Sequence, residues 1–279
     1  MADGADLHEA AFALLMEPDP DRKAAGVRAL EADFARGACA PGGSAPPRPV
    51  PAPGRPERPR LVPPRAVPRR GVGTPEGRVA LIHALAHIEF NAVNLALDAV
   101  YRFRGLPRAF YADWLRVARE EAEHFALLRG RLHAHGAGYG DLDAHDGLWQ
   151  AAVATAGDPL ERMAVVHRGL EARSLDVTPG LITRLRAAGD PETAEVLERI
   201  RREEVGHVAA GARWFRHLCA ARGLEPEAAF TAIARARLGG MLKGPLAVEA
   251  RRAAGFTPAE LAVLEGLAAS RPRGGDALS

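Results

Sequence analysis

Apolar residues recur every three or four positions through long stretches of the chain, which is the pattern of helices that bury one face. Five turn-forming segments interrupt this pattern: "RGLPR", "HGAGYGD", "AGDPL", "AAGDPE" and "RGLEPE". The stretches between them predict four long helices, over about residues 76–103, 107–134, 158–187 and 191–221. No alternating strand pattern competes with them, so the expected fold class is all-α.

The connections between these helices predict how they are joined. The first and second helices, and the third and fourth, are linked by short turns and should form antiparallel hairpins. The segment 135–157 is long enough to run the length of a bundle. We therefore expect residues 76–222 to form a ferritin-like four-helix bundle with one long crossover.

Three flanking segments complete the predicted organisation. Residues 1–40 should be a helical appendage, broken at "EPDPD" by two prolines. Residues 41–75 should be an extended strap, because 41–70 holds eleven of the 22 prolines and seven arginines against one acid. An arginine-rich nucleic-acid arm is the alternative, but no aromatic residue interleaves for base stacking. Residues 223–279 should be a C-terminal helical segment, whose last helix starts at the capping sequence "TPAE".

Charge and cysteine content exclude several classes of protein. The chain has 37 Lys and Arg against 35 Asp and Glu, a balance that does not indicate a nucleic-acid or membrane partner. Its two cysteines lack metal-ligand spacing and cannot build a disulfide scaffold. There is no basic signal sequence and no unbroken run of about 18 apolar residues. We expect a cytoplasmic protein without a membrane segment.

Acidic and imidazole side chains interrupt the apolar faces of the predicted helices in a repeated pattern. E-x-x-H occurs only twice, each time in the second helix of a hairpin, and the preceding helix supplies one further glutamate in apolar surroundings. The spacing from that glutamate to the E-x-x-H glutamate is 32 residues in one hairpin and 33 in the other. This arrangement matches the ligand pattern of carboxylate-bridged di-iron and di-manganese bundles. The predicted metal ligands, which would also be the catalytic residues, are Glu89, Glu121, His124, Glu171, Glu204 and His207.

Burial of these acids favours a metal site over the alternative of surface residues or a buried salt-bridge network. Four carboxylates and two imidazoles in a dry interior are costly unless the acids are protonated or face strong positive charge. Two divalent ions would balance the four carboxylates. Oxygen-rich Glu/His ligation suits iron or manganese.

Several neighbouring residues are weaker candidates. His167 lies one turn before Glu171 and is either a hydrogen-bond partner or extra ligand, or a packed core residue. Asp176, Arg173 and Arg202 could orient carboxylates, although spacing alone does not show it. For two histidines of the first helix, packing or hydrogen bonding is favoured: His83 and His87. For three glutamates next to the E-x-x-H residues, solvated or ion-paired roles are favoured: Glu120, Glu123 and Glu203.

The strings "HALAHIEFNAVNLALDAVYRFRGLPRAFYADWLRVAREEAEHFALL", "YGDLDAHDGLW", "EARSLDVTPG" and "EEVGHVAAGARWF" resemble a bacterial ferritin-like family, domain of unknown function 455. The resemblance covers nearly the whole chain. That family looks distantly related to the di-iron hydroxylase of a methylthiolated, prenylated adenosine in tRNA. The resemblance implies the same six metal ligands that the spacing identified. Ser174 departs from the glycine expected there, and its hydroxyl could lie near the metals.

The expected function is that of an oxygen-activating di-iron oxidase or monooxygenase acting on a small organic or modified-nucleoside substrate. Two iron ions are the expected cofactors, with Mn/Fe or Mn/Mn as alternatives, and dioxygen is the expected co-substrate. The chain has no cysteine module or flavin fingerprint, so a separate reductase or the substrate should supply electrons. A monomer or small oligomer is expected. The alternatives are an iron-oxidising, iron-handling ferritin-like protein and a metal-stabilised protein without turnover.

Overall fold

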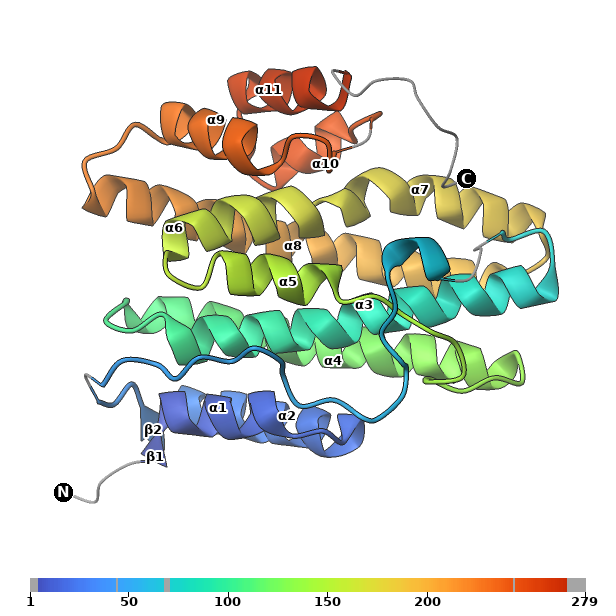
Figure 1. Cartoon of the computed structure of the whole chain (residues 1–279), viewed down its shortest axis with the longest axis horizontal. Coiled ribbons are helices and arrows are strands. Elements are labelled where there is room, and N and C mark those ends of the chain that lie inside the picture. The colour runs from blue at the N-terminus through green and yellow to red at the C-terminus, as the bar shows by residue number, and fades with distance from the viewer. Residues whose placement is uncertain (1–4, 44, 68–70, 243, 270–279) are drawn as a thin grey trace. The chain divides into compact units, whose positions relative to one another are not determined.

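The computed structural model describes residues 5–43, 45–67, 71–242 and 244–269 (Figure 1). This described part contains eleven α-helices, one 3-10 helix, η1 (Pro64–Ala66), and one π-helix, η2 (Met163–Glu171). The predicted all-α class is confirmed. A parallel pair of two-residue strands, β1 (Ala5–Asp6) and β2 (Cys39–Ala40), was not predicted, because two residues are too few to show an alternating pattern. Parts of the predicted strap and C-terminal segment (residue 44, 68–70, 243 and 270–279) lie outside the described residues.

The chain divides into two compact units, residues 1–153 and 154–279. In unit 1 the central hairpin consists of α3 (Pro75–Arg102) and α4 (Arg108–Ala134), close to the predicted bounds. Thr74 accepts a hydrogen bond from the backbone N–H of Gly77 and caps α3, and Pro75 suits the first helical position.

Two N-terminal helices cover this hairpin. The first, α1 (Leu7–Met16), packs on α3, and the second, α2 (Pro20–Ala35), packs on α4 (Figure 1). Unit 1 ends within α5 (Gly147–Ala154). By length and composition α3 could cross a membrane, but 83% of its most apolar window is buried inside the structure. Burial of that kind is expected of a core helix.

The described part of the proline-rich segment, predicted as an extended strap, has no helix over residues 45–63 but contains the short 3-10 helix η1 (Pro64–Ala66). It runs along unit 1 and is tied there by backbone hydrogen bonds, from Gly54 N to Leu15 O (2.9 Å) and from Val62 N to Ala144 O (2.8 Å). Three of its arginines form ion pairs with acids of the same unit: Arg48 with Glu9, Arg55 with Asp146 and Arg60 with Asp143.

Unit 2 is built around α8 (Pro191–Ala221), which packs against η2 and against α7 (Arg173–Ala187). The third predicted helix, over 158–187, is wrong as a single α-helix. It consists of α6 (Pro159–Arg162), then η2, then α7. The apolar spacing of this segment suits either helix type, so only the packed structure distinguishes the π-helical turns.

The C-terminal part of unit 2 contains α9 (Pro226–Arg237), α10 (Val248–Ala253) and α11 (Pro258–Ala269). Thr257 and Glu260 form the predicted capping box at the start of α11. Glu260 also accepts a 2.6 Å hydrogen bond from the buried Arg168 of η2. The Arg168 guanidinium lies 4.3–4.9 Å from the centres of three phenylalanine rings, which belong to Phe215, Phe230 and Phe256. A buried ion pair therefore joins the C-terminal helices to η2.

Candidate metal centre

Unit 1 brings together three of the predicted ligands, Glu89 on α3 and Glu121 and His124 on α4, which we call the unit 1 half-site. All three are buried. His124 Nδ1 lies 3.3 Å from a carboxylate oxygen of Glu89 and 3.3 Å from one of Glu121. The α3–α4 packing accounts for this geometry, because Glu121 and His124 are three residues apart and leave α4 on the same face.

The electrostatics of the unit 1 half-site favour an added positive charge. Burial, followed by the neighbouring charge of Glu121, raises the pKa of Glu89 to about 8. Burial alone would lower the pKa of His124, but hydrogen bonds and charge from Glu121 and Glu89 outweigh it and raise that pKa to about 11. The cluster therefore holds protons at neutral pH in positions that a metal cation could take.

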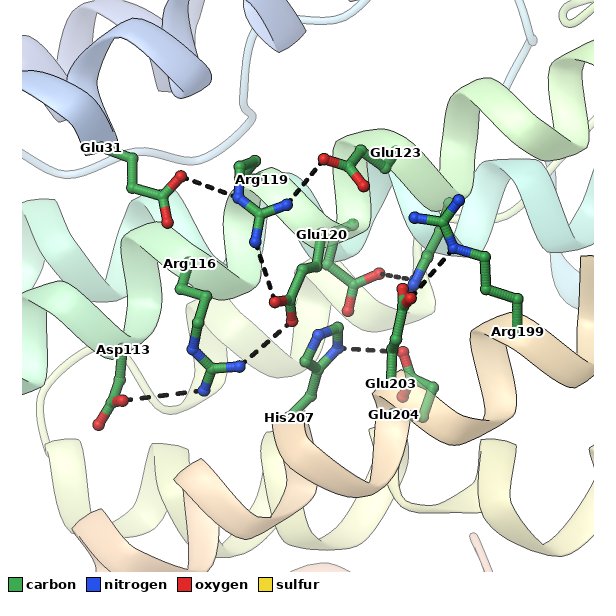
Figure 2. A network of polar contacts seen from close by, with 12 residues as sticks. Glu31, Asp113, Arg116, Arg119, Glu120, Glu123, Arg199, Glu203, Glu204 and His207 are labelled. Atoms are coloured by element: carbon green, nitrogen blue, oxygen red, sulfur yellow. Dashed lines mark hydrogen bonds and ion pairs between the residues drawn. The ribbon is translucent and has the colours of Figure 1, made fainter.

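In unit 2 the other three predicted ligands lie on two segments that pack against each other, Glu171 at the end of η2 and Glu204 and His207 on α8, and we call these three residues the unit 2 half-site. Glu204 and His207 are buried. His207 Nδ1 lies 3.2 Å from a carboxylate oxygen of Glu204 (Figure 2). This geometry repeats the contact between His124 and Glu121 in unit 1, as expected from the repeated E-x-x-H.

Two of the weaker candidates contact this half-site directly. His167 Nδ1 lies 2.6 Å from a carboxylate oxygen of Glu171, and His167 is buried. Ser174 Oγ donates a 3.1 Å hydrogen bond to Glu204. Spacing identified His167, and the departure from the glycine expected by family resemblance identified Ser174, but neither showed which carboxylate each residue contacts.

Other candidates have partners away from the ligands. Both carboxylate oxygens of Asp176 accept hydrogen bonds from the buried Arg251, at 2.8 and 2.6 Å. Asp176, which the sequence offered as a residue that could orient carboxylates, is therefore paired with α10. Arg173 donates to the backbone oxygen of Met241. On α3, His83 Nε2 accepts a hydrogen bond from the backbone N–H of Gly140, and His87 contacts the Tyr139 hydroxyl through Nδ1 and the backbone oxygen of His145 through Nε2, as favoured from sequence.

The glutamates that flank the E-x-x-H pairs form ion pairs, as predicted. Arg119 lies 2.7 Å from Glu123 and 3.0 Å from Glu120, and it reaches Glu31 of α2 at 2.9 Å (Figure 2). In unit 2, Arg199 pairs with Glu203 at 3.0 Å. These contacts hold the outer faces of α4 and α8 while the ligand residues face inward.

Lys23 is among the buried polar residues of unit 1 that the sequence did not single out. Lys23 of α2 is 1% exposed, and its ammonium donates to the backbone oxygens of Leu15 (3.2 Å) and Gly54 (2.8 Å) and to the side chain of Asn94. Burial lowers its pKa to about 7. Its position on the buried stripe of α2, four residues before Val27, is the signal that could have identified it.

The donor set suits a metal ion. In each unit a buried glutamate and histidine of one helix, Glu121 with His124 and Glu204 with His207, offer oxygen and nitrogen ligand atoms. Buried carboxylates beside imidazoles, with no thiolate among them, match the preferences of iron and manganese. The two cysteines, Cys39 and Cys219, are free and buried.

Comparison with known proteins identifies relatives without a described activity. The family model described as "Protein of unknown function (DUF455)" matches residues 16–262. A protein of Haemophilus influenzae, described as uncharacterized, is 47% identical over 200 residues, which cover 69% of each chain. No solved structure matches.

Proposed function

The chain belongs to the DUF455 family, and from this membership and its two buried half-sites we propose that it is a di-iron oxidase or monooxygenase with a ferritin-like helical bundle. The six proposed ligands are the residues of the unit 1 and unit 2 half-sites. Mn/Fe and Mn/Mn are alternative metal pairs with the same donor preferences.

The repeated half-site is the observation that supports this proposal. Each unit holds two glutamates and one histidine on two adjacent helical segments, and in each the E-x-x-H histidine lies 3.2–3.3 Å from its glutamate. A fortuitous buried acid would not be expected to recur with its imidazole in a second hairpin. Two divalent cations would neutralise the four carboxylates, which otherwise must hold protons or repel each other.

In this proposal the protein binds and orients, and the metal provides the oxidising chemistry. Ferrous ions held by these ligands would supply electrons for the activation of dioxygen. Glu89, Glu121 and His124 would bind through oxygen and nitrogen atoms that the α3–α4 packing already brings together. Their burial excludes water from the ligand atoms, which strengthens the electrostatic interactions made there.

We further propose a small organic or modified-nucleoside substrate and a cytoplasmic setting, with a monomeric or small oligomeric protein. This chain carries two cysteines and no cysteine-ligated electron-transfer module, so a separate reductase or the substrate would deliver electrons.

Anaerobic titration with ferrous iron, followed by exposure to oxygen, tests the proposal. We expect about two ions bound per chain and consumption of oxygen by the loaded protein. His124→Ala and His207→Ala should abolish oxygen consumption, because each removes the E-x-x-H imidazole of its half-site. His133→Ala on α4 and His217→Ala on α8 are matched controls, since both histidines are exposed, and they should behave like the wild type.

The same experiment distinguishes the alternatives. Accumulation of many ferric ions per chain in a large shell would instead support iron storage. Metal binding without any oxygen-dependent change would support a metal-stabilised protein. Less than one ion per chain under saturating iron would contradict the di-metal site.

A further inference from the structure

We infer that the two half-sites are unequal, and that the unit 2 half-site binds a divalent cation more tightly than the unit 1 half-site because His167 and Ser174 hold its carboxylates in position. This inference rests on the proposed function and adds to it an order of metal loading. Both residues are positioning residues that act through Glu171 and Glu204.

The contacts of the two carboxylates in unit 2 carry the inference. His167 Nδ1 lies 2.6 Å from Glu171, and Ser174 Oγ donates to Glu204 at 3.1 Å. Glu171 therefore lies beside an imidazole of its own, and Glu204 lies beside Ser174 as well as His207, whereas Glu89 and Glu121 in unit 1 both contact the one imidazole of His124. A carboxylate that is already oriented loses less conformational freedom when it binds a cation.

The sequence repeat breaks at these two positions. His167 lies four residues before Glu171, and the residue four before Glu89 is Leu85. Ser174 lies three residues after Glu171, and the residue three after Glu89 is Ala92. Leucine and alanine side chains carry no hydrogen-bond donor. The side chains at the equivalent positions in unit 1 therefore cannot make the contacts that His167 makes with Glu171 and Ser174 makes with Glu204.

Close packing between η2 and α8 fixes the position of the His167 side chain. His167 belongs to the π-helix η2, and π-helical turns occur frequently at functional sites. On α8, a side chain at Gly211 would meet His167 Cβ at 2.8 Å, so the glycine permits the close approach of the two segments. His167 itself is 0% exposed. Its imidazole is therefore held by the core of unit 2 beside Glu171.

Anaerobic titration with Mn²⁺, with free Mn²⁺ measured by its electron paramagnetic resonance signal, tests this inference. The wild type should bind two ions in separate steps, the first at least about tenfold tighter than the second. His167→Leu and Ser174→Ala introduce at unit 2 the kind of residue that unit 1 carries. Each should weaken binding at the unit 2 half-site by about tenfold, so that the first step moves toward the second while the second stays nearly unchanged.

Thr183→Ala is the matched control, because it removes an exposed hydroxyl from the same helix, α7, that carries Ser174. It should titrate like the wild type. If His167→Leu fails to fold, Ser174→Ala still tests the inference, since serine to alanine changes little volume at a half-buried position.

Two equal steps in the wild type, or an unchanged first step in both variants, would overturn the inference while leaving a dinuclear site intact. Weakening of the second step alone would also overturn it. Failure of the wild type to bind Mn²⁺ and Fe²⁺ at all would instead refute the proposed function, and the inference with it.

Discussion

The carboxyl group of Glu89 illustrates how burial sets the chemistry of a single residue. Its pKa is raised to about 8, first because the group is buried and then because Glu121 lies beside it. His124 contacts both acids, and its pKa is raised to about 11 by them against the effect of burial. Without metal, the unit 1 half-site at neutral pH therefore retains protons that the same residues would release in the unfolded chain.

These shifts predict that the metal-free protein loses stability as pH rises. Between about pH 4.5 and 8 the folded protein binds more protons at Glu89 than the unfolded chain does, so the free energy of unfolding falls with pH, by at most about 1.4 kcal/mol per pH unit from this group. Denaturant unfolding of metal-free protein across this range measures the slope. Glu89→Gln should flatten it, and bound Mn²⁺ should do so in the wild type, because metal displaces the protons. Equal slopes for wild type and Glu89→Gln would contradict the assignment.

At the level of elements, η2 is the segment whose geometry depends most on its neighbours. It carries His167 and Glu171 in unit 2, and two glycines allow close contacts to it. A side chain at Gly211 of α8 would meet His167 Cβ at 2.8 Å, whereas one at Gly169 of η2 would meet the end of the Leu238 side chain at 2.7 Å. The end of a leucine can rotate away, but a Cβ is fixed to its backbone.

This difference predicts opposite outcomes for two alanine substitutions. Gly211→Ala should destabilise the protein, because overpacking costs about 1–3 kcal/mol and exceeds the gain of about 1 kcal/mol in helix propensity. Gly169→Ala should be nearly neutral and serves as the matched variant. Urea unfolding monitored by circular dichroism gives both free energies. If Gly211→Ala is as stable as Gly169→Ala, then the close approach of α8 and η2 does not constrain the π-helix.

At the scale of the molecule, long-range polar contacts join segments that are distant in sequence. In unit 1, Lys23 of α2 links α1 through Leu15, the proline-rich strap through Gly54 and α3 through Asn94. Burial lowers the pKa of Lys23 to about 7. The appendage, the strap and the hairpin of unit 1 therefore share one buried amine as a common contact.

We expect Lys23→Met to destabilise the protein, with a loss that grows as pH rises. The folded pKa is below the ordinary value of 10.5, so between about pH 7 and 10.5 the unfolded chain binds more protons at this amine and its contribution to stability increases with pH. The difference in unfolding free energy between wild type and Lys23→Met, measured at several pH values, checks this. Arg28→Met, which removes an exposed charge from the same helix, should show no such trend. A pH-independent difference would mean that Lys23 keeps its ordinary pKa.

The sequence by itself determined the all-α class and three of the four long helices, α3, α4 and α8, because apolar periodicity and turn residues are local signals. It also identified the two E-x-x-H pairs, since residues three apart on a helix face the same way. In both units, the structure places each of these histidines beside its glutamate.

Only the tertiary structure decided which residues contact one another across elements. The π-helix η2 follows from packing against α8, and its apolar spacing does not distinguish it from an α-helix. Asp176 accepts a hydrogen bond from Arg251, 75 residues away. The Lys23 ammonium donates hydrogen bonds to Gly54 of the strap and to Asn94 of α3. Such pairings depend on where the chain folds back, and the choice among many acids, amines and arginines is made by burial and hydrogen-bond geometry rather than by sequence spacing.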